Sequence, residues 1–155
     1  MSDTFELDIA VYEHKGEILK GLSRQFMRHV SVLVKIDNDN FNIYHVQGTP
    51  GIGLRYVPVK QWKDPRNETA RLLSMDCISD IVIDRISEID DVAKSIPTVT
   101  SRKWNCQNWV EELLAALADK SIISASERDL GIQKMRESVK LPFTTETLNT
   151  RALTD

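Results

Sequence analysis

The chain of 155 residues is 41% hydrophobic and carries a formal net charge of −3. This size and apolar content predict a single domain, which we place at residues 1–142, with residues 143–155 as a loosely ordered tail. Scattered Lys and Arg residues argue against nucleic-acid binding, and no apolar stretch approaches the roughly 18 residues of a membrane span. Because the N-terminus shows no secretory leader, we expect a cytoplasmic protein in which Cys77 and Cys106 are free thiols.

Patterns typical of β-strands fill the first half of the sequence. They predict strands over residues 5–14, 29–36, 41–47, 54–59 and 69–77. The second and third of these are expected to form a hairpin, because turn-forming residues occupy 37–40 between them. The glycine-rich segment 48–53 is expected to be a loop, since its spacing matches neither a P-loop nor a dinucleotide-binding motif.

Helical patterns follow in the second half. Apolar residues recur at helical spacing over 81–95, where Pro97 ends the pattern, and again over 110–117. Residues 124–127 (Ser-Ala-Ser-Glu) are a capping box that opens a further helix to about Val139. A strand-rich half followed by a helical half predicts an α+β protein with an antiparallel sheet.

Cys106 stands where an irregular segment ends and the helix over 110–117 begins, with Asn105 as the expected N-cap. A thiol at a helix N-terminus meets the positive end of the helix dipole and free N–H groups, which both favour the reactive thiolate. His29 and His45, on the predicted hairpin, could serve as base and orienting partner. Each residue taken alone is more often a packing residue, but the combination indicates a thiol nucleophile.

The register of the hairpin decides whether His45 shares a face of the sheet with His29. A two-residue turn over 38–39 places the two imidazoles on opposite faces. A three-residue turn over 37–39 places His45 opposite Ser31, on the face of His29. The sequence leaves both registers open.

These segments resemble a known family. His29 opens a strand of alternating apolar residues, His45 lies on the next strand, and the cysteine stands in the segment 105–110 (Asn-Cys-Gln-Asn-Trp-Val). This order looks like that of the circularly permuted papain-like thiol enzymes of the lecithin:retinol acyltransferase and related phospholipase/acyltransferase group, over about residues 29–118. Permuted deubiquitinase-like peptidases share the layout. The segments His-Val-Gln-Gly-Thr-Pro and Trp-Asn-Cys-Gln-Asn-Trp-Val are also similar to those of small fungal proteins of unassigned activity.

The resemblance implies a permuted papain-like fold and an acyl-enzyme on Cys106, with His29 as general base and His45 as the third member. The expected reaction is hydrolysis or acyl transfer on an ester, thioester or amide of a small molecule or peptide, without a cofactor. Residues that could contact the substrate or oxyanion are Trp104, Asn105, Gln107 and Trp109.

Two alternatives remain open. The first is a non-catalytic binding module on the same scaffold, with an inert thiol beyond hydrogen-bond reach of the histidines. The second is zinc held by one cysteine and two histidines, but their wide spacing in the sequence leads us to expect no metal site. The identity of the substrate and the oligomeric state are open as well.

Overall fold

The computed structural model describes residues 3–14, 21–68, 71–101 and 103–142, so the tail predicted at 143–155 lies outside the described residues. The strands are β1 (Thr4–Tyr12), β2 (His29–Lys35), β3 (Phe41–Tyr44), β4 (Val46–Thr49), β5 (Gly53–Tyr56), β6 (Val59–Trp62) and β7 (Leu72–Val82). The helices are α1 (Arg24–Met27), α2 (Pro65–Glu68), η1 (Ile83–Arg85, a 3-10 turn), α3 (Ile86–Ser95), α4 (Cys106–Asp119) and α5 (Ala125–Val139). Antiparallel strands followed by helices confirm the predicted α+β class.

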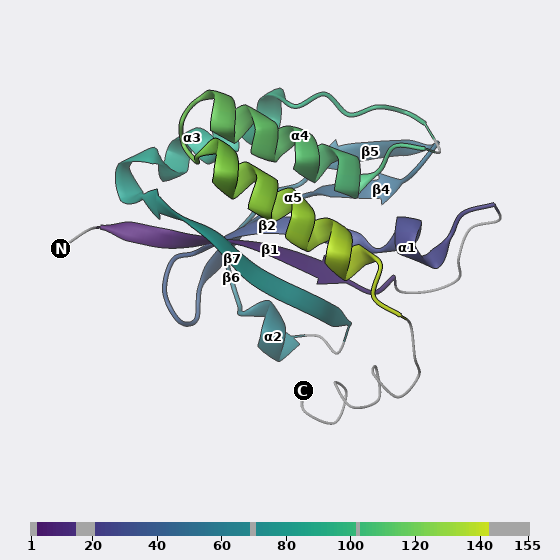
Figure 1. The fold of residues 1–155 in the computed structure, drawn as a ribbon, viewed down its shortest axis with the longest axis horizontal. Coiled ribbons are helices and arrows are strands. Elements are labelled where there is room, and N and C mark those ends of the chain that lie inside the picture. Colours follow the sequence, from purple (N-terminus) through teal and green to yellow (C-terminus); the bar gives the residue numbers. More distant parts are fainter. Residues whose placement is uncertain (1–2, 15–20, 69–70, 102, 143–155) are drawn as a thin grey trace.

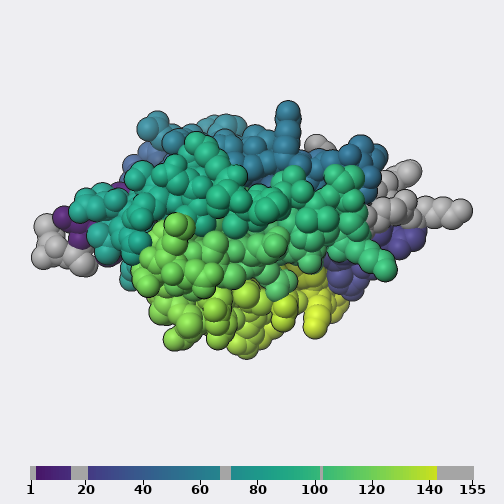
Figure 2. Space-filling view, turned by 90° about the horizontal axis from the view of Figure 1, so that it is seen from above, coloured from purple at the N-terminus to yellow at the C-terminus, as the bar shows by residue number. Residues whose placement is uncertain are grey.

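Five strands form one antiparallel sheet in the order β6-β3-β2-β1-β7, while β4 and β5 form a separate hairpin (Figure 1). Helices α4 and α5 pack against each other and against the central strands. Figure 2 shows α5 (yellow-green) at the surface beside α4 (green). None of the helices in the described ranges has both the length and the apolar character needed to cross a membrane.

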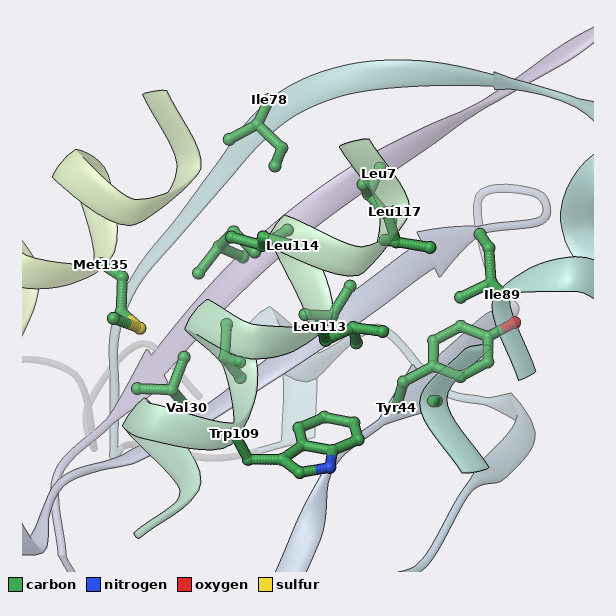
Figure 3. Packing of buried hydrophobic residues seen from close by; sticks show 14 of the residues in the cluster. Leu7, Val30, Tyr44, Ile78, Ile89, Trp109, Leu113, Leu114, Leu117 and Met135 are labelled. Atoms are coloured by element: carbon green, nitrogen blue, oxygen red, sulfur yellow. The ribbon is translucent and has the colours of Figure 1, made fainter. Parts of the chain in front are cut away.

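The main core lies between α4 and the sheet (Figure 3). Trp109 and Leu113 of α4 have no exposed surface and belong to one cluster with Leu7, Val30 and Tyr44 of the sheet. Full burial of a large apolar side chain contributes about 1.5–3 kcal/mol. The cluster therefore fixes α4 against the central strands, and with it the position of the first residue of that helix.

The segment after β3 differs from the prediction in two ways. The predicted strand over 41–47 is broken after Tyr44, because the chain leaves the large sheet there and forms β4. The predicted loop over 48–53 is the closed end of the β4–β5 hairpin. Gly48 has φ +135°, and a Cβ atom there would lie 2.0 Å from the Gly53 carbonyl oxygen, so this close approach of two strands requires glycine.

The helix predicted over 81–95 begins later than expected. Strand β7 continues to Val82, the 3-10 turn follows, and α3 begins at Ile86. Ile81 pairs with Phe5 of β1 and has no exposed surface, so strand pairing and burial outweigh the local helical pattern. The strand predicted over 69–77 corresponds to the first part of this longer β7.

Asp8 carries a buried carboxyl group on the face of the sheet opposite the main core. The residue is 3% exposed, and burial, with a smaller contribution from the Glu6 carboxylate, raises the pKa of Asp8 to about 6. The ordinary pKa of the side chain is 3.8, so the folded protein holds a proton that the unfolded chain releases. The stabilisation from this group is complete below about pH 3.8 and is lost as the pH rises through about 6.

We therefore expect Asp8→Asn to raise the free energy of unfolding by about 1–2 kcal/mol at about pH 7 and to have little effect at about pH 3.5. This expected gain is smaller than the free energy that corresponds to the full pKa shift of Asp8. Glu6 and Cys77 beside it are exposed to solvent, which screens the interactions of the charged carboxylate. Urea unfolding at both pH values measures the difference. Asp80→Asn, which removes an exposed carboxylate opposite Glu6, is the matched control, and an equal gain from both variants would contradict the expectation.

Candidate active site

The first turn of α4 is fixed by a reciprocal pair of asparagine contacts. The Asn105 side chain accepts a hydrogen bond from the Gln107 N–H at 2.9 Å, which confirms Asn105 as the N-cap. The Asn108 side chain accepts in turn from the Asn105 N–H at 3.0 Å, which completes a capping box. Cys106 is therefore the first residue of the helix.

The same turn is tied to the segment that precedes β2. The Gln107 side-chain amide donates to the carbonyl groups of Gln25 at 2.8 Å and Arg28 at 3.1 Å. The Asn105 side-chain amide donates to the Phe26 carbonyl group. These contacts hold the start of α4 against α1 and the residue that precedes β2, and they occupy the Gln107 amide that was a candidate for substrate contact.

The Cys106 thiol is buried and neutral. The residue is 8% exposed, and its Sγ donates to the Arg28 carbonyl oxygen at 3.6 Å. Burial raises the pKa of the Cys106 thiol to about 11, although the backbone N–H groups of Val30, Cys106 and Gln107 act in the opposite direction. The predicted thiolate at the helix N-terminus is therefore wrong for this conformation, because the loss of water outweighs the favourable helix end.

The side chains of His29 and His45 are hydrogen-bonded to each other. Nε2 of His29 lies 2.9 Å from Nδ1 of His45, and the rings meet edge to face with their centroids 5.1 Å apart. Burial, followed by the neighbouring imidazole, lowers the pKa of His29 to about 3, and burial lowers the pKa of His45 as well. Both imidazoles are therefore neutral at physiological pH.

The hairpin has the three-residue turn. The Ile36 N–H donates to the Asn40 carbonyl group at 2.9 Å, which leaves residues 37–39 as the turn, and β2 and β3 pair in the register that follows. Continued by one residue beyond the last pair, Val32–Tyr44, this register directs His45 to the side of His29, as the second of the two predicted alternatives requires, although His45 itself lies between β3 and β4.

Cys106 and His29 lie on opposite sides of β2. Val30 packs in the core beneath α4, so side-chain alternation directs His29 to the opposite face, where its ring centroid lies 5.8 Å from that of Tyr12. Within the described residues, Cys106 makes no hydrogen bond to either histidine, and the three side chains do not gather closely enough to hold one metal ion. The potential ligands that do lie close together are Glu6, Asp8 and Cys77, elsewhere on the sheet.

Cys106, His29 and His45 nevertheless line one pocket of about 360 Å³. The pocket lies where β4 has left the large sheet and the start of β2 has lost its neighbour on that side. Asn105, Gln47 and His14 also line it, with the apolar residues Phe26, Met27, Val46, Pro50 and Leu54. Among the described residues that line the pocket there is no Asp, Glu, Lys or Arg side chain, so this part of the lining suits an uncharged group.

Trp104 and Trp109, the two tryptophans predicted as possible substrate contacts, are not among the lining residues. Trp109 has no exposed surface and stacks on Tyr56 with 5.5 Å between ring centroids (Figure 3 shows the indole in the core). Trp104 is partly buried against the same core. By contrast, sequence reasoning missed Gln47, whose Nε2 lies 3.4 Å from Nε2 of His45. The signal in the sequence was that Gln47 follows His45 by two residues in a predicted strand, where side chains two residues apart lie on the same side.

The protein is therefore an α+β protein in which a cysteine at a helix N-terminus and a hydrogen-bonded pair of histidines line the same pocket. Residues 17–124 match a family of unknown function, DUF6540, and the chain belongs to this family. No curated protein and no solved structure matches the chain.

Proposed function

We propose that the protein is a cysteine-dependent hydrolase or acyltransferase that acts on an ester, thioester or amide through an acyl-enzyme on Cys106. The observation that carries the proposal is the shared pocket, which brings the thiol and a hydrogen-bonded histidine pair to one cavity. The order of these residues along the chain resembles that of permuted papain-like thiol enzymes, and the proposal includes this scaffold. The uncharged character of the described lining residues favours a neutral acyl group from a small molecule or peptide.

His29 is the general base in this proposal. Its Nε2 faces His45, so Nδ1 is the ring nitrogen left to take the Cys106 proton. The thiol donates to the Arg28 carbonyl group in the observed conformation, and rotation about the Cα–Cβ bond of Cys106 must release it. Because the thiol and the imidazole are both neutral, proton transfer accompanies attack on the substrate instead of preceding it.

The remaining steps follow from this transfer. The sulfur forms a bond to the acyl carbon while the backbone N–H group of Cys106 stabilises the oxyanion, since the Asn105 side chain occupies the Gln107 N–H. The leaving group departs with the proton held by His29, and His45 supports the transient imidazolium. Water or another nucleophile then gives up its proton to His29 and takes the acyl group from Cys106, and His29 returns this proton to the released sulfur to restore the neutral thiol. Hydrolysis and acyl transfer share every step except the identity of this acceptor.

A binding module is the second candidate, and a specific observation favours it. Cys106 is buried, burial raises its pKa, and it is hydrogen bonded to a backbone carbonyl group and not to His29. Under this alternative, the pocket receives an uncharged ligand, and the thiol serves packing.

Acylation of Cys106 distinguishes the two candidates. In a Cys77→Ser background, we expect 4-nitrophenyl acetate to add one acetyl group to Cys106, and His29→Ala to slow this step by about 10²–10⁴-fold because the general base is lost. Intact-protein mass spectrometry over time measures the rate.

His14→Ala removes a different imidazole from the lining of the same pocket and is the matched control, for which we expect little change. A different result would contradict the proposal: equal acetylation rates in the parent protein and both variants that rise only as the pH approaches the high pKa of the thiol. The cysteine would then be inert, and the binding module would be the remaining candidate.

A further inference from the structure

Gln47 extends the histidine pair into a chain of three side chains. Its Nε2 lies 3.4 Å from Nε2 of His45, and the other nitrogen of that ring lies 2.9 Å from Nε2 of His29. The backbone of Gln47 is held in β4 by pairing with Arg55 of β5. All three members of the chain line the pocket that contains Cys106.

The hydrogens of this chain can adopt two arrangements. Each neutral imidazole carries one N–H, and only one hydrogen fits between the facing nitrogens of His29 and His45. If the Gln47 amide N–H₂ group donates to Nε2 of His45, then His45 donates from Nδ1 and His29 carries its own hydrogen on Nδ1. If the Gln47 carbonyl oxygen accepts from Nε2–H of His45, the direction of both bonds is reversed.

Only the second arrangement supplies a base. It puts the hydrogen of His29 on Nε2 and leaves a lone pair on Nδ1, the nitrogen that must accept the thiol proton. The first arrangement blocks Nδ1 with a hydrogen. The structure places the amide nitrogen of Gln47 toward His45, and a half-turn of the amide exchanges nitrogen for oxygen.

We propose that the side-chain amide of Gln47 is a positioning group that sets the tautomers of His45 and His29, and thereby switches His29 between a blocked and a competent base. This role deepens the proposed function and rests on it. In this role Gln47 acts through its contact with His45.

Two variants with opposite hydrogen-bonding capacity test this role. Gln47→Glu presents only acceptors and Gln47→Lys only donors, while Gln47→Met offers neither. Gln47 is exposed, so the fold tolerates each change. Long-range proton–nitrogen NMR correlations near neutral pH report which nitrogen of each imidazole carries the hydrogen. Arg55 faces position 47 across the hairpin, so each variant is also made with Arg55→Gln to remove a competing partner for Glu.

We expect the ratio of His29 carrying its hydrogen on Nε2 to His29 carrying it on Nδ1 to differ by about tenfold or more between the Glu and Lys variants, with Met between them. The Cys106 acetylation rate should follow this ratio, with the Glu variant faster than the Lys variant. Identical tautomers in all three variants would overturn the role of Gln47, whatever the acetylation rate. Absence of acetylation in the parent protein would overturn the proposed enzyme and leave the tautomer result standing.

Discussion

Replacing Arg28 with alanine is expected to lower the free energy of unfolding by about 3–5 kcal/mol. The Arg28 side chain has no exposed surface, and its Nε and Nη2 donate to the Glu13 carboxylate at 3.2 and 2.9 Å. Its Nη1 donates to the carbonyl groups of Val139 at 2.7 Å and Leu141 at 2.5 Å, at the end of α5. Truncation leaves a buried carboxylate and two helix-end carbonyl groups without their donor, which is the costly outcome for a buried ion pair.

Urea unfolding followed by tryptophan fluorescence measures this loss. Arg24→Ala is the matched control, because Arg24 also lies near Glu13, at 3.7 Å, but its side chain is 36% exposed, so we expect a loss below about 1 kcal/mol. The double variant Arg28→Met/Glu13→Leu should recover a large part of the stability, since neither charge is then buried alone. Equal losses of unfolding free energy in Arg28→Ala and Arg24→Ala would contradict this expectation.

Arg28 also connects stability to the candidate site. Its side chain joins Glu13, the residue after β1, to the end of α5, while its carbonyl group accepts from the Cys106 thiol and the Gln107 amide. His29 is the next residue in the chain. A change at Arg28 is therefore expected to disturb both the resting position of the thiol and the start of β2.

The parts of this site that depend on local sequence could be predicted. The capping box at 124–127 and the N-cap Asn105 mark the starts of α5 and α4, because the side chains involved are at most three residues from the N–H groups that they satisfy. The same reasoning identified Cys106 as a helix-start residue. Turn-rich composition likewise located the hairpin between β2 and β3, but it left the number of turn residues open.

The parts that depend on distant contacts could not be predicted. The hairpin turn is a local exception, because its residues fit a turn of two or three residues, and the Asp37 side chain, which accepts from the Asp39 N–H at 2.8 Å, accompanies the longer turn. Arg28 finds its partners 15 and more than 100 residues away, so no local pattern indicates a buried arginine. The burial of Cys106, which reverses the expected shift of its pKa, is likewise a property of tertiary packing.

The second large effect is a loss of stability in acid that depends on His29. Burial lowers the pKa of His29 from 6.5 to about 3, so between these values the unfolded chain binds a proton that the folded protein excludes. The stabilisation from neutral His29 is complete above about pH 6.5 and decreases as the pH falls toward 3. One pKa unit corresponds to about 1.4 kcal/mol, so we expect a loss of about 2–3 kcal/mol between pH 7 and pH 4 from this group.

His29→Gln tests this expectation, because an uncharged amide replaces the imidazole and cannot take up the proton. The contribution of Asp8 to the free energy of unfolding increases over the same fall in pH. Both proteins are therefore compared in the Asp8→Asn background, where that opposing contribution is removed. The parent protein should lose about 2–3 kcal/mol more than His29→Gln in urea unfolding between pH 7 and pH 4. Parallel losses in the parent and His29→Gln would mean that the folded pocket admits the imidazolium. In that case the neutral histidine pair, on which both the general-base mechanism and the tautomer role of Gln47 depend, would not be the state present at mildly acidic pH.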